Sequence, residues 1–219
     1  HLMISGSGDT NLKIWDLRSG KPVQTIKHHS KAVNCAKISP DGNWVASGGS
    51  DGNTFITDIR TEKVVHWFEE PGQIITSLEF NPKTYTMSTG WNGKLINYYD
   101  LESFGIINAM KFNTSPVNEI KFYNKDDFDI VEWGFFGSND YIRLINCERN
   151  EQAKVYSVPH DTLTDMKVDL NNNLLTCLCT YQSELTYWGV KLPNLDEIEN
   201  ETDMQVDQDI PTNNQYQVI

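Results

Sequence analysis

The sequence predicts an all-β fold built from repeated four-stranded units, and three observations support it. Three segments end alike, and their last residues, Asp16, Asp58 and Asp100, are 42 residues apart twice. The intervals hold short runs of β-branched and aromatic residues separated by Gly, Pro, Asn and Asp, as strands and turns require. A helical period of 3.6 residues is nowhere sustained. Because a period of about 40–45 residues is typical of propeller blades, we predict a β-propeller.

The second to fourth repeats each accommodate four short strands. In the second repeat the expected strands are separated by the turns Ser39–Gly42 and Gly48–Gly52, where Pro presets φ and Gly accepts a positive φ. The expected strands are 33–38, 44–47, 54–58 and 64–68, then 75–80, 85–88, 95–99 and 106–112, then 117–122, 130–133, 141–145 and 153–158.

The two ends of the repeat array differ from its middle. The first repeat opens at Leu2–Gly6, which matches the second strand of the next repeat, so we expect its own first strand to be missing. Asn146 stands in the Asp position of the fourth copy, and a weaker fifth copy covers 185–189. We therefore predict a partial propeller over residues 1–192, about four and a half blades of a ring of about seven. The expected blade boundaries lie near residues 28, 70, 114 and 160.

Charge is concentrated at the C-terminal end. The chain has a net charge of −12, and residues 193–219 contain seven acidic residues with no Lys or Arg. This composition predicts an acidic, disordered tail. An acidic chain is poorly suited to counterion-release binding, so we expect no nucleic-acid partner. No apolar run approaches the length of a membrane-spanning helix, so we expect no membrane partner. Because the sequence begins at His1 and not at Met, we expect it to be a piece of a longer protein.

The segment from Gly6 to Asp16 resembles the hallmark of the WD-repeat family of β-propellers. In that family a turn Asp precedes the terminal Asp by about seven residues, a place that Gly93 takes in the third repeat and Asn139 in the fourth. Thr57 stands in the family's Trp position. The resemblance implies a structural hydrogen-bond network that includes Asp9, Trp15, Asp16, His29, Ser47, Asp51, Asp58, Asp100 and Asp140.

A narrower resemblance covers nearly all of residues 1–192. The segments 6–17, 32–42, 100–104, 116–122 and 137–144 are similar, in the same order, to the propeller of the katanin regulatory subunit. That resemblance implies a non-catalytic subunit whose partners are an AAA-type severing ATPase and microtubule-, centrosome- or cilium-associated proteins. It also implies a place in the cytoplasm, on the cytoskeleton. The helical domain with which that family binds its ATPase is not visible in this sequence.

An alternative is a general WD-repeat adaptor, such as a ciliary or axonemal scaffold or a ubiquitin-ligase substrate receptor. By analogy with the fold, we expect partner binding at loop ends that share one rim. Trp91 is expected in a turn, where an exposed aromatic residue anchors partners, or packed on a neighbouring loop. The predicted rim consists of Lys31, Asn34, Asn53, Trp91, Pro116 and Asn118.

No catalytic set is predicted. The chain lacks a GxxxxGK[ST] phosphate loop and a Cys/His zinc pattern. Ser47, His29 and Asp51 could form a triad, yet they are the same residues as the structural network. His28 and His29 are adjacent and should point apart, and residues 126–129 lack the spacing of a calcium loop. We therefore expect no enzymatic activity, no cofactor and no metal.

Overall fold

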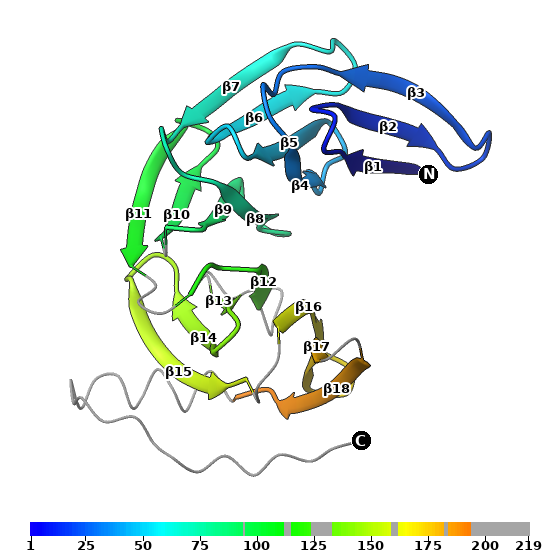
Figure 1. Ribbon diagram of the computed structural model, residues 1–219. Helices are drawn as coiled ribbons and strands as arrows, with labels where there is room; N and C mark the ends of the chain where they lie inside the picture. Colours follow the sequence, from blue (N-terminus) through cyan, green and yellow to red (C-terminus); the bar gives the residue numbers. More distant parts are fainter. Residues whose placement is uncertain (94, 112–114, 124–132, 159–161, 182–183, 194–219) are drawn as a thin grey trace. The chain divides into compact units, whose positions relative to one another are not determined.

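The computed structural model in Figure 1 describes residues 1–93, 95–111, 115–123, 133–158, 162–181 and 184–193. These residues form strands in five antiparallel sheets, and no helix occurs among them. It follows that none of the described segments is a helix able to cross a membrane. The all-β prediction is confirmed. The chain divides into two compact units, 1–117 and 118–219, each of which is described by itself.

Unit 1 contains three blades, each a sheet in which strands adjacent in sequence pair side by side (Figure 1). Blade 1 has three strands, while blades 2 and 3 have four. The strands are β1 (Leu2–Gly6), β2 (Leu12–Asp16) and β3 (Lys21–Ile26); β4 (Val33–Ile38), β5 (Trp44–Gly49), β6 (Asn53–Asp58) and β7 (Val64–Glu69); β8 (Ile75–Phe80), β9 (Thr86–Trp91), β10 (Leu95–Asp100) and β11 (Gly105–Lys111).

Unit 2 contains two blades. Blade 4 has four strands, and the described part of blade 5 has three. The strands are β12 (Glu119–Tyr123), β13 (Trp133–Gly137), β14 (Tyr141–Asn146) and β15 (Glu151–Ser157); β16 (Thr162–Asp169), β17 (Leu174–Tyr181) and β18 (Glu184–Lys191).

The expected bounds of the second strands in blades 2, 3 and 4 are wrong, and the expected strand 85–88 runs on to Trp91. Gly48 and Gly49 were expected in a turn, but they end β5 and pair with Thr54 and with Val33 and Cys35 across the sheet. The expected strand 130–133 overlaps β13 only at Trp133, because the strand runs on to Gly137. In each case small residues that suggest a turn are accommodated within a strand whose neighbours approach closely.

A glycine recurs near the end of the strand that precedes the turn in β1, β5, β9 and β13. A Cβ on Gly48 would lie 2.4 Å from a side-chain carbon of Ile75, the first residue of β8. The equivalent Gly6, Gly90 and Gly137 would meet Val33, Val117 and Leu163 in the same way. Any larger residue would push the neighbouring blade away. The repeated glycine therefore lets adjacent blades approach.

The hydrophobic core lies between neighbouring sheets within each unit. One cluster joins blades 1 and 2 and includes Leu12, Ile14 and Val45, and a second joins blades 2 and 3. In unit 2, a cluster of blades 4 and 5 contains Phe135 and Trp188. Sheet-on-sheet packing of this kind buries both faces of a blade, which explains why its strands are apolar runs as well as alternations.

Some predictions fall on residues that the structure does not describe. The predicted acidic tail, apart from Pro193, lies outside the described residues, as do residues 126–129. The predicted blade boundaries near 28 and 70 lie between β3 and β4 and between β7 and β8. Those near 114 and 160 lie at residues outside the described part of the chain.

Candidate functional site

His29 links three segments of blade 2. Its Nδ1 lies 3.1 Å from both carboxylate oxygens of Asp51, and its Nε2 lies 2.9 Å from Ser47 Oγ. His29 precedes β4, Ser47 lies in β5, and Asp51 lies in the turn before β6. The network therefore ties the start of the blade to its second strand and to the following turn.

Asp51 stays ionised within this network. Burial opposes its charged form, but the backbone N–H of Ser30, the His29 ring and the backbone N–H of Asn53 together hold its pKa below the usual 3.8. Ser30 N–H donates to Asp51 Oδ2 at 2.8 Å, and Asn53 N–H donates to Oδ1 at 3.1 Å. A carboxylate with several donors is a strong structural anchor.

These three side chains have the atomic order of a Ser-His-Asp triad, yet their burial makes them structural. A nucleophilic serine must be open to a substrate carbonyl, whereas Ser47 is 2% exposed and His29 is 7% exposed. A Cβ on Gly49 would already lie 2.5 Å from His29 Nδ1, so the space beside the imidazole is filled. The arrangement can hold the blade together, but it offers no access to a substrate.

Blade 1 keeps the other half of the expected network. Trp15 Nε1 donates to Ser5 Oγ at 2.9 Å, and these residues stand one repeat before Thr57 and Ser47. In blade 2, the Thr57 hydroxyl is buried and has no hydrogen-bond partner among the described residues. Asp9, the blade 1 equivalent of Asp51, is exposed and accepts the backbone N–H of Asn11 at 3.0 Å.

Trp91 is buried at the end of a strand, which corrects its expected place in a turn and excludes the exposed alternative, leaving the packed one. It is the last residue of β9, it is 1% exposed, and its Nε1 donates to Thr89 Oγ1 at 2.7 Å. Trp91 stands one repeat after Gly49, and Pro71 stands one repeat after His29. Because blade 3 has no histidine in that place, its Gly49 position can carry a large side chain. The indole then bonds Thr89 as the imidazole of His29 bonds the equivalent serine.

Tyr99 completes the blade 3 set. It stands one repeat after Thr57, it is buried, and Asn97 Nδ2 donates to its hydroxyl at 3.0 Å. Burial raises the pKa of Tyr99, while hydrogen bonds with Asn97 and Thr89 act in the opposite direction. Blade 3 thus replaces the histidine network with two aromatic residues and a threonine.

The acidic residue at the end of each third strand caps the turn that follows. Asp58 Oδ1 accepts the backbone N–H groups of Arg60 and Thr61 at 2.9 and 2.8 Å. The same bond recurs in the other blades: the side-chain Oδ1 accepts the backbone N–H of the second residue after it at Asp16, Asp100 and Asn146. Asn replaces Asp here because an amide oxygen serves the same Asx turn.

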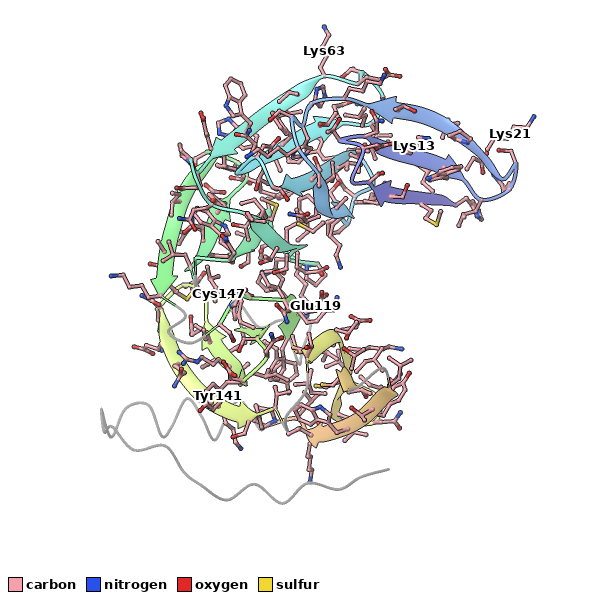
Figure 2. All side chains as sticks on the ribbon, in the orientation of Figure 1. Lys13, Lys21, Lys63, Glu119, Tyr141 and Cys147 are labelled. Carbon is pink, nitrogen blue, oxygen red and sulfur yellow. The ribbon has the colours of Figure 1, made fainter. Side chains whose placement is uncertain are left out.

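The fourth residue after each cap has a left-handed backbone. The φ angles are 64° at Gly20, 59° at Glu62, 55° at Phe104 and 58° at Asn150. Only Gly adopts this conformation without steric cost. The next residues, Lys21 and Lys63, project away from their blades (Figure 2).

Phe104 offsets its backbone strain by packing between blades 2 and 3. Its ring stacks on His66 with centroids 4.5 Å apart and lies 6.2 Å from the ring of Trp44. His66 belongs to β7 and Trp44 to β5, so the strained turn of blade 3 reaches across to blade 2. Such stacking contributes roughly 0.5–1.5 kcal/mol beyond area burial.

In blades 2, 3 and 4, a side chain near the start of the first strand donates to a backbone oxygen 41 to 45 residues further along the chain. Asn34 Nδ2 donates to Ile75 O at 2.9 Å, and Thr76 Oγ1 donates to Val117 O at 2.6 Å. In unit 2, Asn118 Nδ2 donates to Leu163 O at 3.1 Å. Two residues predicted to bind partners, Asn34 and Asn118, therefore form hydrogen bonds between blades.

The remaining predicted residues differ in exposure. Lys31 is exposed, whereas Asn53 and Pro116 are half-buried. Asp140, predicted as part of the structural network, has an exposed side chain, and the neighbouring Asn139 accepts the amide of Asn118 in its place. Lys31 and Asn34 are the two members of the predicted set whose residues are exposed.

Comparison with known proteins agrees with this geometry. Residues 20–58 match the family described as WD domain, G-beta repeat. The matched segment runs from β3 through β6, so the sequence repeat joins the last strand of one blade to the first three of the next. The fold is all-β with propeller-type blades, and the matched WD repeat lies across the first two of them. Five of its blades lie within the described residues.

Two of the curated proteins that this chain resembles match it over half of its length. One is Small ribosomal subunit protein RACK1y of Oryza sativa subsp. japonica, with 34% identity over 109 residues, which cover 50% of this chain and 32% of that protein. The other is Cross-pathway control WD-repeat protein 2 of Flammulina velutipes, with 31% identity over 110 residues, covering 50% and 34%. The match spans about a third of each relative's length. Neither name is that of a katanin subunit, so the katanin resemblance stays a prediction.

Proposed function

We propose that this chain is part of a non-catalytic protein-interaction scaffold. The observation that carries this proposal is that the side chains able to act as nucleophile, base or acid form hydrogen bonds inside the blades. The buried His29 bonds both Ser47 and Asp51, and Asp58 is used by its own turn. What remains for function is the exposed surface of the turns, which suits recognition of other proteins.

The enzymatic alternative is tested with the purified chain. We expect no hydrolysis of ATP or of an activated ester above the rate without protein. Ser47→Ala serves as the matched variant, because it removes the one hydroxyl that His29 could activate. Hydrolysis that Ser47→Ala abolishes would overturn the proposal.

We propose further that the scaffold is the regulatory subunit of a katanin-like microtubule-severing complex. The support is the order of the five segments similar to that subunit between residues 6 and 144. Residues 1–192 contain 18 basic and 23 acidic residues, and microtubule surfaces are acidic. Targeting would therefore act through protein partners and not through bulk charge. The corresponding location is the cytoplasm and the microtubule cytoskeleton, including centrosome, basal body or cilium.

A pull-down with the full-length protein distinguishes this assignment from the broader one. Recovery of an AAA-type ATPase, identified by mass spectrometry, is the result that the katanin assignment requires. Recovery of other proteins without that ATPase would contradict it and leave the scaffold proposal in place.

A general WD-repeat adaptor is the second candidate. The identity with RACK1y, named as a small ribosomal subunit protein, favours this broader class. Co-sedimentation of the full-length protein with ribosomes, or its recovery with ubiquitin-ligase or axonemal components, would support an adaptor over a severing subunit.

A further inference from the structure

A pocket of about 210 Å³ lies between blades 2 and 3 in unit 1. Two equivalent turns form it, the one joining β4 to β5 and the one joining β8 to β9, together with the residue that follows β10. Its apolar lining consists of Pro40, Trp44, Phe80, Pro82, Tyr85 and Leu101. Two prolines and three aromatic residues thus surround one cavity.

The turns that form the pocket are held in place. Trp44 N–H donates to Ser39 Oγ at 2.9 Å, and Leu101 N–H donates to Tyr85 O at 2.8 Å. Trp44 also lies against Phe104, which is stacked on His66. A pre-formed pocket of this kind costs little ordering energy when it is occupied.

The size and lining of the pocket indicate a polypeptide side chain. Small-molecule sites measure roughly 300–1,000 Å³, so this pocket is smaller than a metabolite site. Tyr85 stands 59% exposed beside it, in reach of a partner. Aromatic and proline surfaces of this kind are the ones on which extended, proline-containing segments dock, because that conformation is already formed before binding.

The charges at and beside the pocket have an acidic surplus, which favours a basic partner segment. Asp41 and Lys83 both line the pocket and offset each other, and the surplus comes from Asp100 and Glu102, the sequence neighbours of Leu101. The hydroxyl of Ser39 holds the pKa of Asp41 below its usual value, so the carboxylate stays ionised. A segment with Lys or Arg beside its proline would complement these carboxylates.

We propose that this pocket anchors a proline-containing, basic, extended segment of a protein partner. The proposal rests on the scaffold function and names the chemistry of one ligand of that scaffold. It assigns Tyr85 as the principal anchor, with Trp44 and the two prolines as the walls.

The test measures fluorescence anisotropy of a labelled peptide with a Pro-Leu-Pro-Pro centre between lysine pairs, added to the full chain. Tyr85→Ala is expected to weaken binding about tenfold, as for an aromatic anchor. Trp67→Ala is the matched control, because Trp67 is 57% exposed on β7 and does not line the pocket. Glu102→Lys should also weaken peptide binding, and the loss of affinity should be larger at low salt than at high salt.

Two companion peptides identify the chemistry. Replacement of the Pro-Leu-Pro-Pro centre by Ser and Gly, or of the lysines by Glu, should each abolish most of the binding. Equal binding to all three peptides, or equal binding to wild type and Tyr85→Ala, would overturn the proposal. If Tyr85→Ala leaves recovery of protein partners by the full-length protein unchanged and no peptide binds, the pocket proposal fails while the scaffold proposal stands.

Discussion

Blades 2 and 3 fill the same interior place with different chemistry. In blade 2, His29 bonds Ser47 and Asp51, and glycine at position 49 leaves room for the imidazole. In blade 3, Trp91 occupies the position of Gly49 and bonds Thr89. A polar network and an indole therefore serve as alternative fillings, and the residue at the glycine position decides which of them fits.

The outer turns of the same two blades show a second contrast. Glu62 and Phe104 adopt nearly the same left-handed backbone, with φ of 59° and 55°. Phe104 is half-buried against His66 of blade 2, while Glu62 is exposed. The left-handed conformation thus occurs once with inter-blade packing, at Phe104, and once at an exposed residue whose N–H bonds the carbonyl oxygen of Asp58.

The largest expected effect is the loss of the blade 3 indole. Trp91→Ala should lower the free energy of unfolding by about 3–5 kcal/mol. It leaves a cavity and removes the indole N–H that donates to Thr89 Oγ1. Denaturant titration of the full chain measures this. Trp67→Ala, at an exposed aromatic residue, is the control and should cost less than about 1 kcal/mol. Similar losses at both positions would contradict the burial of Trp91.

A double-mutant cycle tests whether His29 and a side chain at position 49 exclude each other. Gly49→Ala should destabilise by about 1–3 kcal/mol, because its Cβ would lie 2.5 Å from His29 Nδ1. In the His29→Ala background the same change should cost much less, which gives a coupling energy of about 1–3 kcal/mol. Additive effects in the denaturation experiment would show that the two positions do not compete for space.

The blade 2 network should also make stability depend on pH. The pKa of Asp51 is lowered on folding, so its contribution is present above the usual value of 3.8 and is lost as the pH falls through the folded-state pKa. The difference in unfolding free energy between wild type and Asp51→Asn should be about 1–3 kcal/mol at neutral pH and shrink under acid conditions. Asp9→Asn, at the exposed equivalent in blade 1, should show a smaller change. A difference that does not vary with pH would argue against an ionised Asp51.

The smallest expected effect concerns the outer turns. Glu62→Gly should stabilise the chain by about 0.5–1 kcal/mol, because glycine relieves the left-handed strain. Phe104→Gly relieves the same strain but removes the stack on His66, so it should destabilise by about 1 kcal/mol. Thermal unfolding of the two variants side by side measures both, and changes of the same sign would contradict the role given to the Phe104 ring.

Several features of the fold and site follow from local sequence. The spacing of Asp16, Asp58 and Asp100 predicts the blades, because each carboxylate caps its own turn within three residues. Asn146 in the Asp position of the fourth repeat is also predictable from sequence, since its amide oxygen accepts the equivalent backbone N–H. Local hydrogen bonds leave a local signature, and a repeat multiplies it.

Other features depend on residues far apart in the chain. Asn34 is a polar residue at a strand start, and only the position of Ile75, 41 residues on, turns it into a bond between blades. The turn position expected for Trp91 is wrong: Asn92 and Gly93 suggest a turn, but the strand β9 continues to Trp91. The space that its indole fills is free because Pro71, and not a histidine, stands one repeat after His29.

The sequence by itself therefore determined the all-β repeat, its period and its capped turns, because these arise from contacts within a few residues. Only the tertiary structure decided which side chain fills each blade. It also decided which polar residues join neighbouring blades and where the pocket beside Tyr85 forms. These depend on how closely one sheet approaches the next, a distance that recurring glycines such as Gly48 permit and that packing across the sheets determines.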